Sequence, residues 1–343
     1  MAHRFSIRDI ARQAGVSEAT VDRVLHGRTG VRQSTVGQVG QAIEELETQQ
    51  VQLELSGRTF VIDVVVDAPS RFSQAIRAAL EAELPLLRPA AFRARFHLSQ
   101  HWSAEECVEQ LAKIARRGSH GVLLKATDSP GVAEAVGMLT GMGIPVVTVV
   151  TDLPSTARIA YVGPDNRSAG STAAYLMCAW LGDRPGDVAL TVSKDGFRGE
   201  EEREMGFRAT LRKLAPTRII HELPDSEGID VAAEQYMEQI LARHSELAGV
   251  YSIGGGNSGL VRAIQRAGSR GTVVIGHDLN KENSLLLSGG ALHAVLGHNL
   301  RSDMHAACRA LMHYHRALPG GYEPERSPIE IHTPYNLPPT AAH

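Results

Sequence analysis

The chain has 343 residues, of which 43% are hydrophobic and 21% are charged, and its formal net charge is −3. This length predicts two or three domains of ordinary globular composition. A net acidic charge excludes a protein that coats nucleic acid through its overall charge. No stretch approaches the roughly 18 apolar residues that cross a membrane. The N-terminus lacks the apolar core of a signal peptide, so we expect a cytoplasmic protein without membrane contact.

The first 46 residues predict three short helices. Ser6 is expected to cap the first helix and Ser17 the second, and the third begins at Ser34. Gly15 ends the first helix, so the first two form a helix-turn-helix. Over positions 1–40, six arginines outnumber three carboxylates, which gives a local charge of +3. This excess favours DNA binding over a small helical bundle without a ligand.

The sequence from Ile7 to Leu25 reads I-x-D-I-A-x-x-A-G-V-S-x-x-T-V-x-R-V-L, and a matching pattern continues from Val31 to Leu46. Both resemble the DNA-binding head of the lactose-repressor (LacI-type) family of bacterial regulators. The resemblance implies that side chains of the second helix contact operator DNA. Base edges would be read by Glu18, Ala19 and Arg23, and phosphates would be held by Ser17 and Thr20.

Residues 47–58 are expected to form a linker or hinge. Leu55 to Arg58 resembles the end of the family's hinge, where a leucine inserts into the minor groove. The family's usual aromatic-Pro-Asn connector is missing, and Glu54 beside Leu55 is unfavourable for such an insertion. Asp22 is a second departure, because its carboxylate would repel phosphates unless Arg23 or Arg28 offsets it.

Residues 59–343 alternate apolar strands with helical patterns, which predicts parallel sheets covered on both faces. The strands are too many for one small sheet. We therefore expect two doubly wound lobes, with ligands in the crevice at the carboxyl ends of the strands. The first lobe would comprise about 59–162 and 291–320, and the second about 163–290 and 321–343. The predicted fold is thus a small all-α helix-turn-helix head followed by a two-lobed α/β sensor.

Later motifs resemble the sugar-binding sensor of the same family, which shares the type I periplasmic-binding-protein fold with ribose-type binding proteins. They are Gly143–Val147, Val162–Gly170, Glu202–Phe207 and Ile275–Asp278. Mapped by motif, the ligand-binding residues would be Phe72, Asp152, Asn166, Arg203, Asn257, Asp278 and His298. They offer acceptors, amides, a forked donor and an aromatic face, which suit the hydroxyls and C–H groups of a sugar.

Structural alternatives stand beside several of these assignments. Asp165-Asn166 could simply cap the following helix. Arg203 could pair with Glu200 or Glu204 on an exposed helix, and Phe72 could belong to the core. Asp278 has the strongest support, because it directly follows an apolar strand.

Two further patterns compete with this interpretation. Gly254–Gly259 satisfies G-x-G-x-x-G, and Asp278 lies nineteen residues beyond it, as in a dinucleotide fingerprint. Because the motif comes late in the chain, we expect its glycines instead to let the backbone come close to a ligand, which the side chain of Asn257 would recognise. The later histidines include His313-x-His315, whose side chains would point apart on a helix. Cys107, Cys178 and Cys308 are widely spaced. We expect no cofactor, metal site or disulfide framework.

The sequence therefore predicts a ligand-responsive transcriptional regulator, with repression as the expected mode. A homodimer or a tetramer would bind double-stranded operator DNA, and a sugar or polyol between the lobes would change the operator affinity. No enzymatic activity is expected. The alternative is a kinase-like, sugar-handling enzyme with a regulatory head, although no G-x-x-x-x-G-K-[ST] loop is present.

Overall fold

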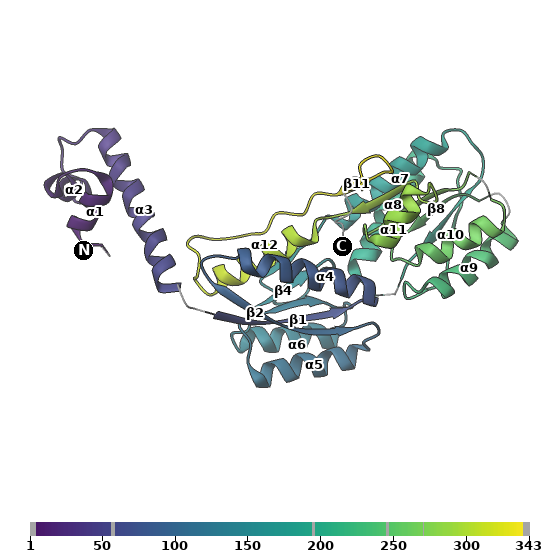
Figure 1. The fold of residues 1–343 in the computed structure, drawn as a ribbon, viewed down its shortest axis with the longest axis horizontal. Coiled ribbons are helices and arrows are strands. Elements are labelled where there is room, and N and C mark those ends of the chain that lie inside the picture. The colour runs from purple at the N-terminus through teal and green to yellow at the C-terminus, as the bar shows by residue number, and fades with distance from the viewer. Residues whose placement is uncertain (1–4, 56–58, 194–195, 245–246, 270, 339–343) are drawn as a thin grey trace.

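The computed structural model describes residues 5–55, 59–193, 196–244, 247–269 and 271–338. They form a helical head and two α/β lobes (Figure 1). The head contains α1 (Ile7–Ala14), α2 (Glu18–Leu25) and α3 (Gln33–Leu55).

The two predicted caps of the head are confirmed. The Ser6 Oγ accepts the Asp9 amide at 3.1 Å, and the Ser17 Oγ accepts the Thr20 amide at 3.2 Å. Gly15 ends α1 with a φ of +65°, which favours glycine. The fully buried side chains of the head come from all three helices; they are Ile10, Ala11, Val21 and Val39.

The third helix is longer than predicted, because α3 continues to Leu55. Residues 41–55 contain no glycine or proline and are rich in Gln, Glu and Leu, which favour helix. Most of the predicted linker is therefore helical, and residues 56–58 lie outside the described residues. The side chain of Leu55 also lies outside them, so its insertion into DNA stays a prediction.

The first lobe is built on a parallel sheet with strand order β2-β1-β3-β4-β5. Helices α4 and α12 cover one face, and α5 and α6 cover the other (Figure 1). The bounds are β1 Thr59–Asp67, α4 Ser70–Glu83, β2 Ala91–Ser99, α5 Ala104–Arg117, β3 Val122–Lys125, α6 Pro130–Gly141, β4 Val146–Val149, β5 Ala160–Val162 and α12 Leu300–Tyr314.

The second lobe has strand order β11-β10-β9-β8-β6-β7, in which the last strand of the chain, β11, pairs antiparallel with β10. Its core has one cluster around α7 and α8 and another around α9 and α10. The bounds are α7 Asn166–Leu181, β6 Asp187–Thr191, α8 Arg198–Leu214, β7 Ile220–Glu222, α9 Asp230–Arg243, β8 Leu247–Ser252, α10 Asn257–Arg266, β9 Val273–His277, α11 Lys281–Ser288, β10 Ala294–Gly297 and β11 Glu330–His332.

Two details of this lobe differ from the prediction. The predicted boundary at residue 291 is wrong, because β10 pairs with β9 and so belongs to the second lobe. The chain returns to the first lobe only after Gly297, where α12 packs on α4, β4 and β5. The short helix α11, which Asn280 caps, was not predicted, because its eight residues have little amphipathic pattern.

The chain passes between the lobes three times, and hydrogen bonds join these crossings. The amide of Ser327, in the last crossing, donates to the Gly163 carbonyl of the first at 3.0 Å. The Ser327 hydroxyl donates to Asp303, whose other carboxylate oxygen lies 2.5 Å from the Nδ1 atom of His298 in the middle crossing. His298 thus belongs to the hinge.

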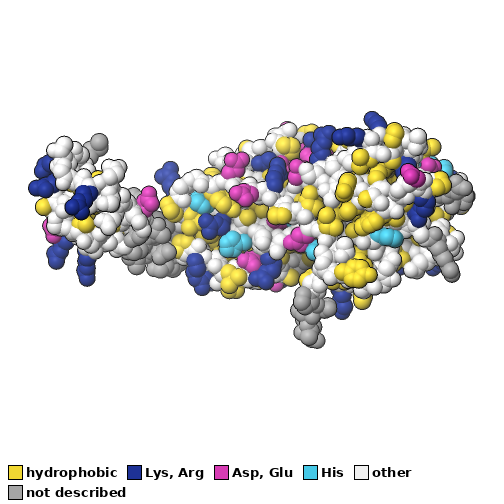
Figure 2. All heavy atoms as spheres, turned by 90° about the horizontal axis from the view of Figure 1, so that it is seen from above, with side chains coloured by type: hydrophobic (Ala, Val, Ile, Leu, Met, Phe, Trp, Pro, Cys, Tyr) yellow, Lys and Arg dark blue, Asp and Glu magenta, His cyan; other side chains and the backbone are white. Residues whose placement is uncertain are grey.

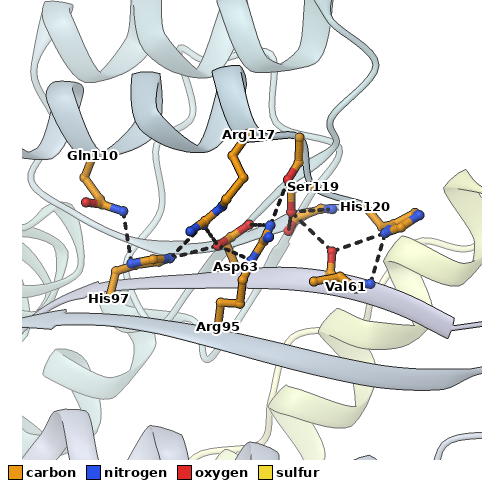
Figure 3. A network of polar contacts seen from close by, with 10 residues as sticks. Val61, Asp63, Arg95, His97, Gln110, Arg117, Ser119 and His120 are labelled. Atoms are coloured by element: carbon orange, nitrogen blue, oxygen red, sulfur yellow. Dashed lines mark hydrogen bonds and ion pairs between the residues drawn. The ribbon is translucent and has the colours of Figure 1, made fainter.

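A buried ion cluster holds α5 against the first sheet (Figure 3). Asp63 on β1 is fully buried, and its carboxylate accepts from Arg95 at 3.0 and 2.6 Å and from Arg117 at 2.6 Å. The imidazole of His97 lies 2.8 Å away. Burial alone would raise the pKa of Asp63, but the hydrogen bonds from His97 and Arg95 hold it below its usual value.

Asp63→Asn should lower the free energy of unfolding by about 2–3 kcal/mol at pH 7, because it removes the carboxylate between partly exposed arginines. The folded pKa is lowered, so this contribution is complete above the unfolded pKa of about 3.9 and is lost as the pH falls further. Urea titrations at pH 7 and pH 3.5 check this. The exposed pair Arg77–Glu81 provides the control variant Glu81→Gln. Equal stability of Asp63→Asn and wild type at pH 7 would contradict it.

Candidate functional site

A cleft lies between the two lobes, where the carboxyl ends of parallel strands from both sheets meet. The space between its walls is about 670 Å³, of which part is open to solvent. Its walls follow the ends of β1, β3, β4, β6, β8 and β9. The polar side chains of its lining are Arg71, Lys125, Thr151, Ser193, Glu200, Arg203, His277, Asp278, Asn280 and Asn283.

Lys125, the last residue of β3, is the buried cation of the cleft. Its Nζ donates to the Asp67 carbonyl at 2.8 Å and lies 3.6 Å from the ring centroid of Phe197 in the second lobe. The ring of Phe72, on the first lobe, is 6.0 Å away. Burial lowers the pKa of Lys125 to about 8, although Glu200 and Asp67 favour its charge. The ammonium thus lies between two aromatic faces, where cation–π attraction stabilises it.

Glu200 and Arg203, both on α8, form the opposite wall. The carboxylate of Glu200 accepts from the amide of Ser193 at 2.7 Å and from its hydroxyl. Burial raises the pKa of Glu200 above its usual value. The Nε of Arg203 donates to the Asn166 amide oxygen at 2.8 Å, and its Nη1 donates to the Ile253 carbonyl at 3.2 Å. These partners fix the guanidinium plane at the cleft.

Asp278 follows β9 and has a φ of +64°, which turns the chain at the edge of the cleft. Among the described residues, no hydrogen-bond donor contacts its carboxylate, while its backbone carbonyl accepts from Asn283 at 2.8 Å. Beside it, His277 is buried and lies 2.7 Å from the Tyr251 hydroxyl. Burial lowers the pKa of His277 well below its usual value, so its imidazole is neutral. The edge thus offers one open carboxylate beside neutral groups.

Three of the seven predicted ligand-binding residues line the cleft: Phe72, Arg203 and Asp278. The structure does not bring the other four into its lining. Asn166 orients Arg203 and also donates to the Val150 carbonyl. Asp165 caps α7, as the structural alternative predicted. His298 is held by Asp303 at the hinge.

Asp152 and Asn257 bind protein groups in this structure, so a direct contact with ligand stays a prediction for both. The carboxylate of Asp152 accepts from Arg158 at 2.5 and 2.7 Å, and that ion pair fixes the turn after β4. Asn257 donates to the Asn283 side chain at 2.9 Å and so supports the lining without belonging to it. A sequence motif locates a polar residue, but it does not show which protein group hydrogen-bonds to its side chain.

Sequence reasoning missed Lys125, Glu200, Phe197 and His277. A signal existed for Lys125 and His277, since each ends an apolar strand, which is the position that made Asp278 a candidate. In the sequence, Glu200 was considered as a possible partner of Arg203 on an exposed helix. It does lie in the first turn of α8, but its neighbours Glu202 and Glu204 pair with Arg198 and Arg208 while it turns into the cleft.

The glycine-rich loop after β8 packs against side chains of the cleft. A Cβ on Gly254 would lie 2.4 Å from the Ser193 Cβ, and one on Gly255 would lie 2.7 Å from the Arg71 Nη2. Gly255 also has a φ of +116°, which favours glycine. The glycines therefore let the loop approach both cleft walls.

Several contacts cross the cleft and hold the lobes together. The Arg71 Nη2 donates to the Gly228 carbonyl at 3.0 Å, and its Nη1 lies 3.5 Å from the Glu282 carboxylate. The Gly199 amide donates to the Thr151 hydroxyl at 2.9 Å. These contacts join the first lobe to the second, so the structure shows the sensor closed.

In the head, the predicted DNA-contacting residues lie on one helix. Glu18, Ala19 and Arg23 are exposed on α2, and the hydroxyls of Ser17 and Thr20 lie 2.8 Å apart at its N-terminus. Figure 2 shows arginine side chains projecting from the head. The carboxylate of Asp22 is 3.0 Å from Arg28, which offsets its charge as the sequence suggested.

Comparisons with known proteins agree with both parts of the chain. Residues 62–317 match the family "Periplasmic binding protein domain", and residues 6–48 match "Bacterial regulatory proteins, lacI family". The chain is a LacI-family regulator with a periplasmic-binding-protein sensor. This confirms the predicted family and fold class.

Individual relatives are distant. The ribose import binding protein RbsB of Escherichia coli is 24% identical over 58% of this chain and 66% of its own length. The HTH-type transcriptional regulator GntR of Pseudomonas aeruginosa is 27% identical over 72% of this chain and 71% of its own. The structure of GanP, a glucose-galactose binding protein from Geobacillus stearothermophilus, has a TM-score of 0.73 with 19% identity, covering 82% of this regulator and 99% of GanP.

Across the described residues of the regulator, none of the helices is both long and apolar enough to pass through a membrane. The helix α3, with 23 residues, is the longest in the head but is rich in Gln and Glu.

Arg71→Ala should open the unliganded sensor, because it removes donors that cross the cleft. Loss of about 1 kcal/mol would change the closed-to-open ratio about fivefold. Small-angle X-ray scattering should show a larger radius of gyration. Arg77→Ala, on the same helix but paired with Glu81 within its own lobe, is the matched control. An unchanged radius for Arg71→Ala would show that this contact does not hold the lobes closed.

Proposed function

We propose that this regulator binds operator DNA through α2 and changes its operator affinity when a sugar or polyol occupies the cleft between the lobes. It would act as a repressor in the bacterial cytoplasm, where its operator lies. The observation that carries the proposal is a cleft, at the carboxyl ends of two parallel sheets, lined by aromatic rings and fixed polar groups, in a chain that also has a helix-turn-helix head.

The chemistry of the cleft suits a polyhydroxylated ligand. Asp278 and Glu200 supply carboxylate acceptors, Arg203 supplies a fixed donor, and Phe72 supplies a face for C–H groups. The lining contains both cations and carboxylates, so the ligand need not carry a charge of its own. The similarity to RbsB, a ribose import binding protein, and to GanP, a glucose-galactose binding protein, supports a sugar as the ligand.

The head supports specific binding to double-stranded DNA. Side chains of Glu18, Ala19 and Arg23 are exposed where a recognition helix meets base edges. The hydroxyls of Ser17 and Thr20 lie at the positive end of α2, which suits contact with phosphates. We propose a homodimer, or a tetramer built from dimers, whose two-fold axis matches the symmetry of the operator.

The proposed link between the sites is the closure of the lobes. A ligand that contacts both cleft walls binds the closed state more tightly than the open one and so shifts the population. A coupling of about 1–3 kcal/mol would change operator affinity about 5- to 150-fold. We propose no turnover of the ligand, since the glycine-rich loop packs on the cleft walls and not around a phosphate.

A thermal-shift screen with monosaccharides, polyols, sugar phosphates and nucleotides tests the effector class. A ligand at a hundred times its Kd should stabilise the sensor by about 2.7 kcal/mol, which raises Tm by several degrees. Asp278→Asn, which tolerates the positive φ, should weaken binding of the sugar found at least about tenfold, because it removes a charged acceptor. The exposed Asp183→Asn is the control. A response confined to nucleotides would overturn the sugar proposal.

Arg23→Ala should relax base preference in the operator at a cost of about 1–3 kcal/mol. The measurement is the ratio of affinities for operator and for a base-substituted operator, by fluorescence anisotropy at fixed salt. Arg116→Ala, which removes the same charge from an exposed site on α5, should leave this ratio unchanged. If Arg23→Ala also leaves it unchanged, Arg23 does not read bases.

A further inference from the structure

Three side chains with metal-binding atoms converge at the outer edge of the second sheet. Asp187 is the first residue of β6, His221 lies on the edge strand β7, and His244 follows the last turn of α9. Their ligand atoms all lie within 4.8 Å of one another. None of the three is fully buried, so an ion can reach them from solvent.

The local geometry orients this cluster. The Nε2 of His221 lies 2.8 Å from the Oδ2 of Asp187, and the amide of Ile219 donates to the Oδ1 at 3.4 Å. The imidazoles of His221 and His244 stack with their ring centroids 3.7 Å apart.

We propose that Asp187, His221 and His244 bind a divalent transition metal of the zinc type. Two imidazole nitrogens and one carboxylate oxygen are ligands that Zn²⁺ accepts, with water as the fourth ligand of a tetrahedron. Mg²⁺ prefers oxygen ligands and should not compete. Binding requires the stacked rings to turn so that one nitrogen of each faces a shared point near the Asp187 carboxylate.

The bound ion would tie α9 to the paired strands β6 and β7. Because Asp187 begins β6 while Ser193, beyond its other end, lines the cleft, the metal site is separate from the proposed effector site. The metal would therefore stabilise the second lobe without touching the sugar. Sequence reasoning predicted no metal, because these ligands are far apart in the chain and only the fold brings them together.

The test uses the untagged full chain, stripped with a chelator and titrated with ZnCl2 by calorimetry. We expect one saturable site, a rise in Tm with Zn²⁺ and no effect of MgCl2. His244→Ala, and separately Asp187→Asn, should weaken Zn²⁺ binding by more than about tenfold. Circular dichroism checks that each variant is folded. If one variant does not fold, the other still tests the site.

His101→Ala is the matched control, because His101 also faces a carboxylate, that of Glu227 at 3.1 Å, but lies outside the cluster. Its Zn²⁺ affinity should equal that of the wild type. X-ray absorption should show nitrogen and oxygen neighbours at about 2.0–2.2 Å. Unchanged Zn²⁺ binding in His244→Ala and Asp187→Asn, sulfur neighbours, or no saturable binding would each overturn the proposal.

Discussion

The strands of the two sheets end toward each other, and this constraint decides where charged groups can gather. A strand buried on both faces carries charge in its middle only at a cost, as Asp63 does with two arginines and a histidine around it. Lys125 and Asp278 avoid that cost by lying at or just beyond strand ends. Even there, Lys125 is desolvated and held by a carbonyl and an aromatic ring. A ligand thus meets groups that have already lost water and mobility.

The contacts that close the lobes are few and mostly polar, in contrast to the apolar clusters that form each lobe. Arg71 reaches across to a backbone carbonyl and a carboxylate, and Thr151 accepts one amide from the other side. Hydrogen bonds of this kind can be replaced by hydrogen bonds to water at a small cost in free energy. We therefore expect the closed and open states to differ in free energy by about a few kcal/mol, a difference that the binding of one small ligand can overcome.

Much of the fold could be predicted from the sequence, because its signals are local. Serine caps, Gly15 and the alternation of apolar strands with helices each depend on neighbouring residues. The continuation of α3 and the short α11 were missed, since propensity extends a helix without a clear stop and eight residues show little periodicity. The site was predictable only in part. Asp278 has a positional signal, whereas the partner of Asp152 lies on a turn whose shape the sequence does not show.

The hinge limits what the sensor can report. Its three crossings are tied to one another through Ser327, Gly163, Asp303 and His298, so twisting or sliding one lobe against the other would break several hydrogen bonds together. Bending across the crossings would strain these bonds less. We therefore expect ligands of different shape to close the lobes along the same path. A weak effector would then close a smaller fraction of the molecules, but into the same closed form. The response of the head would therefore depend on how much ligand is bound and how tightly, and not on the shape of the ligand.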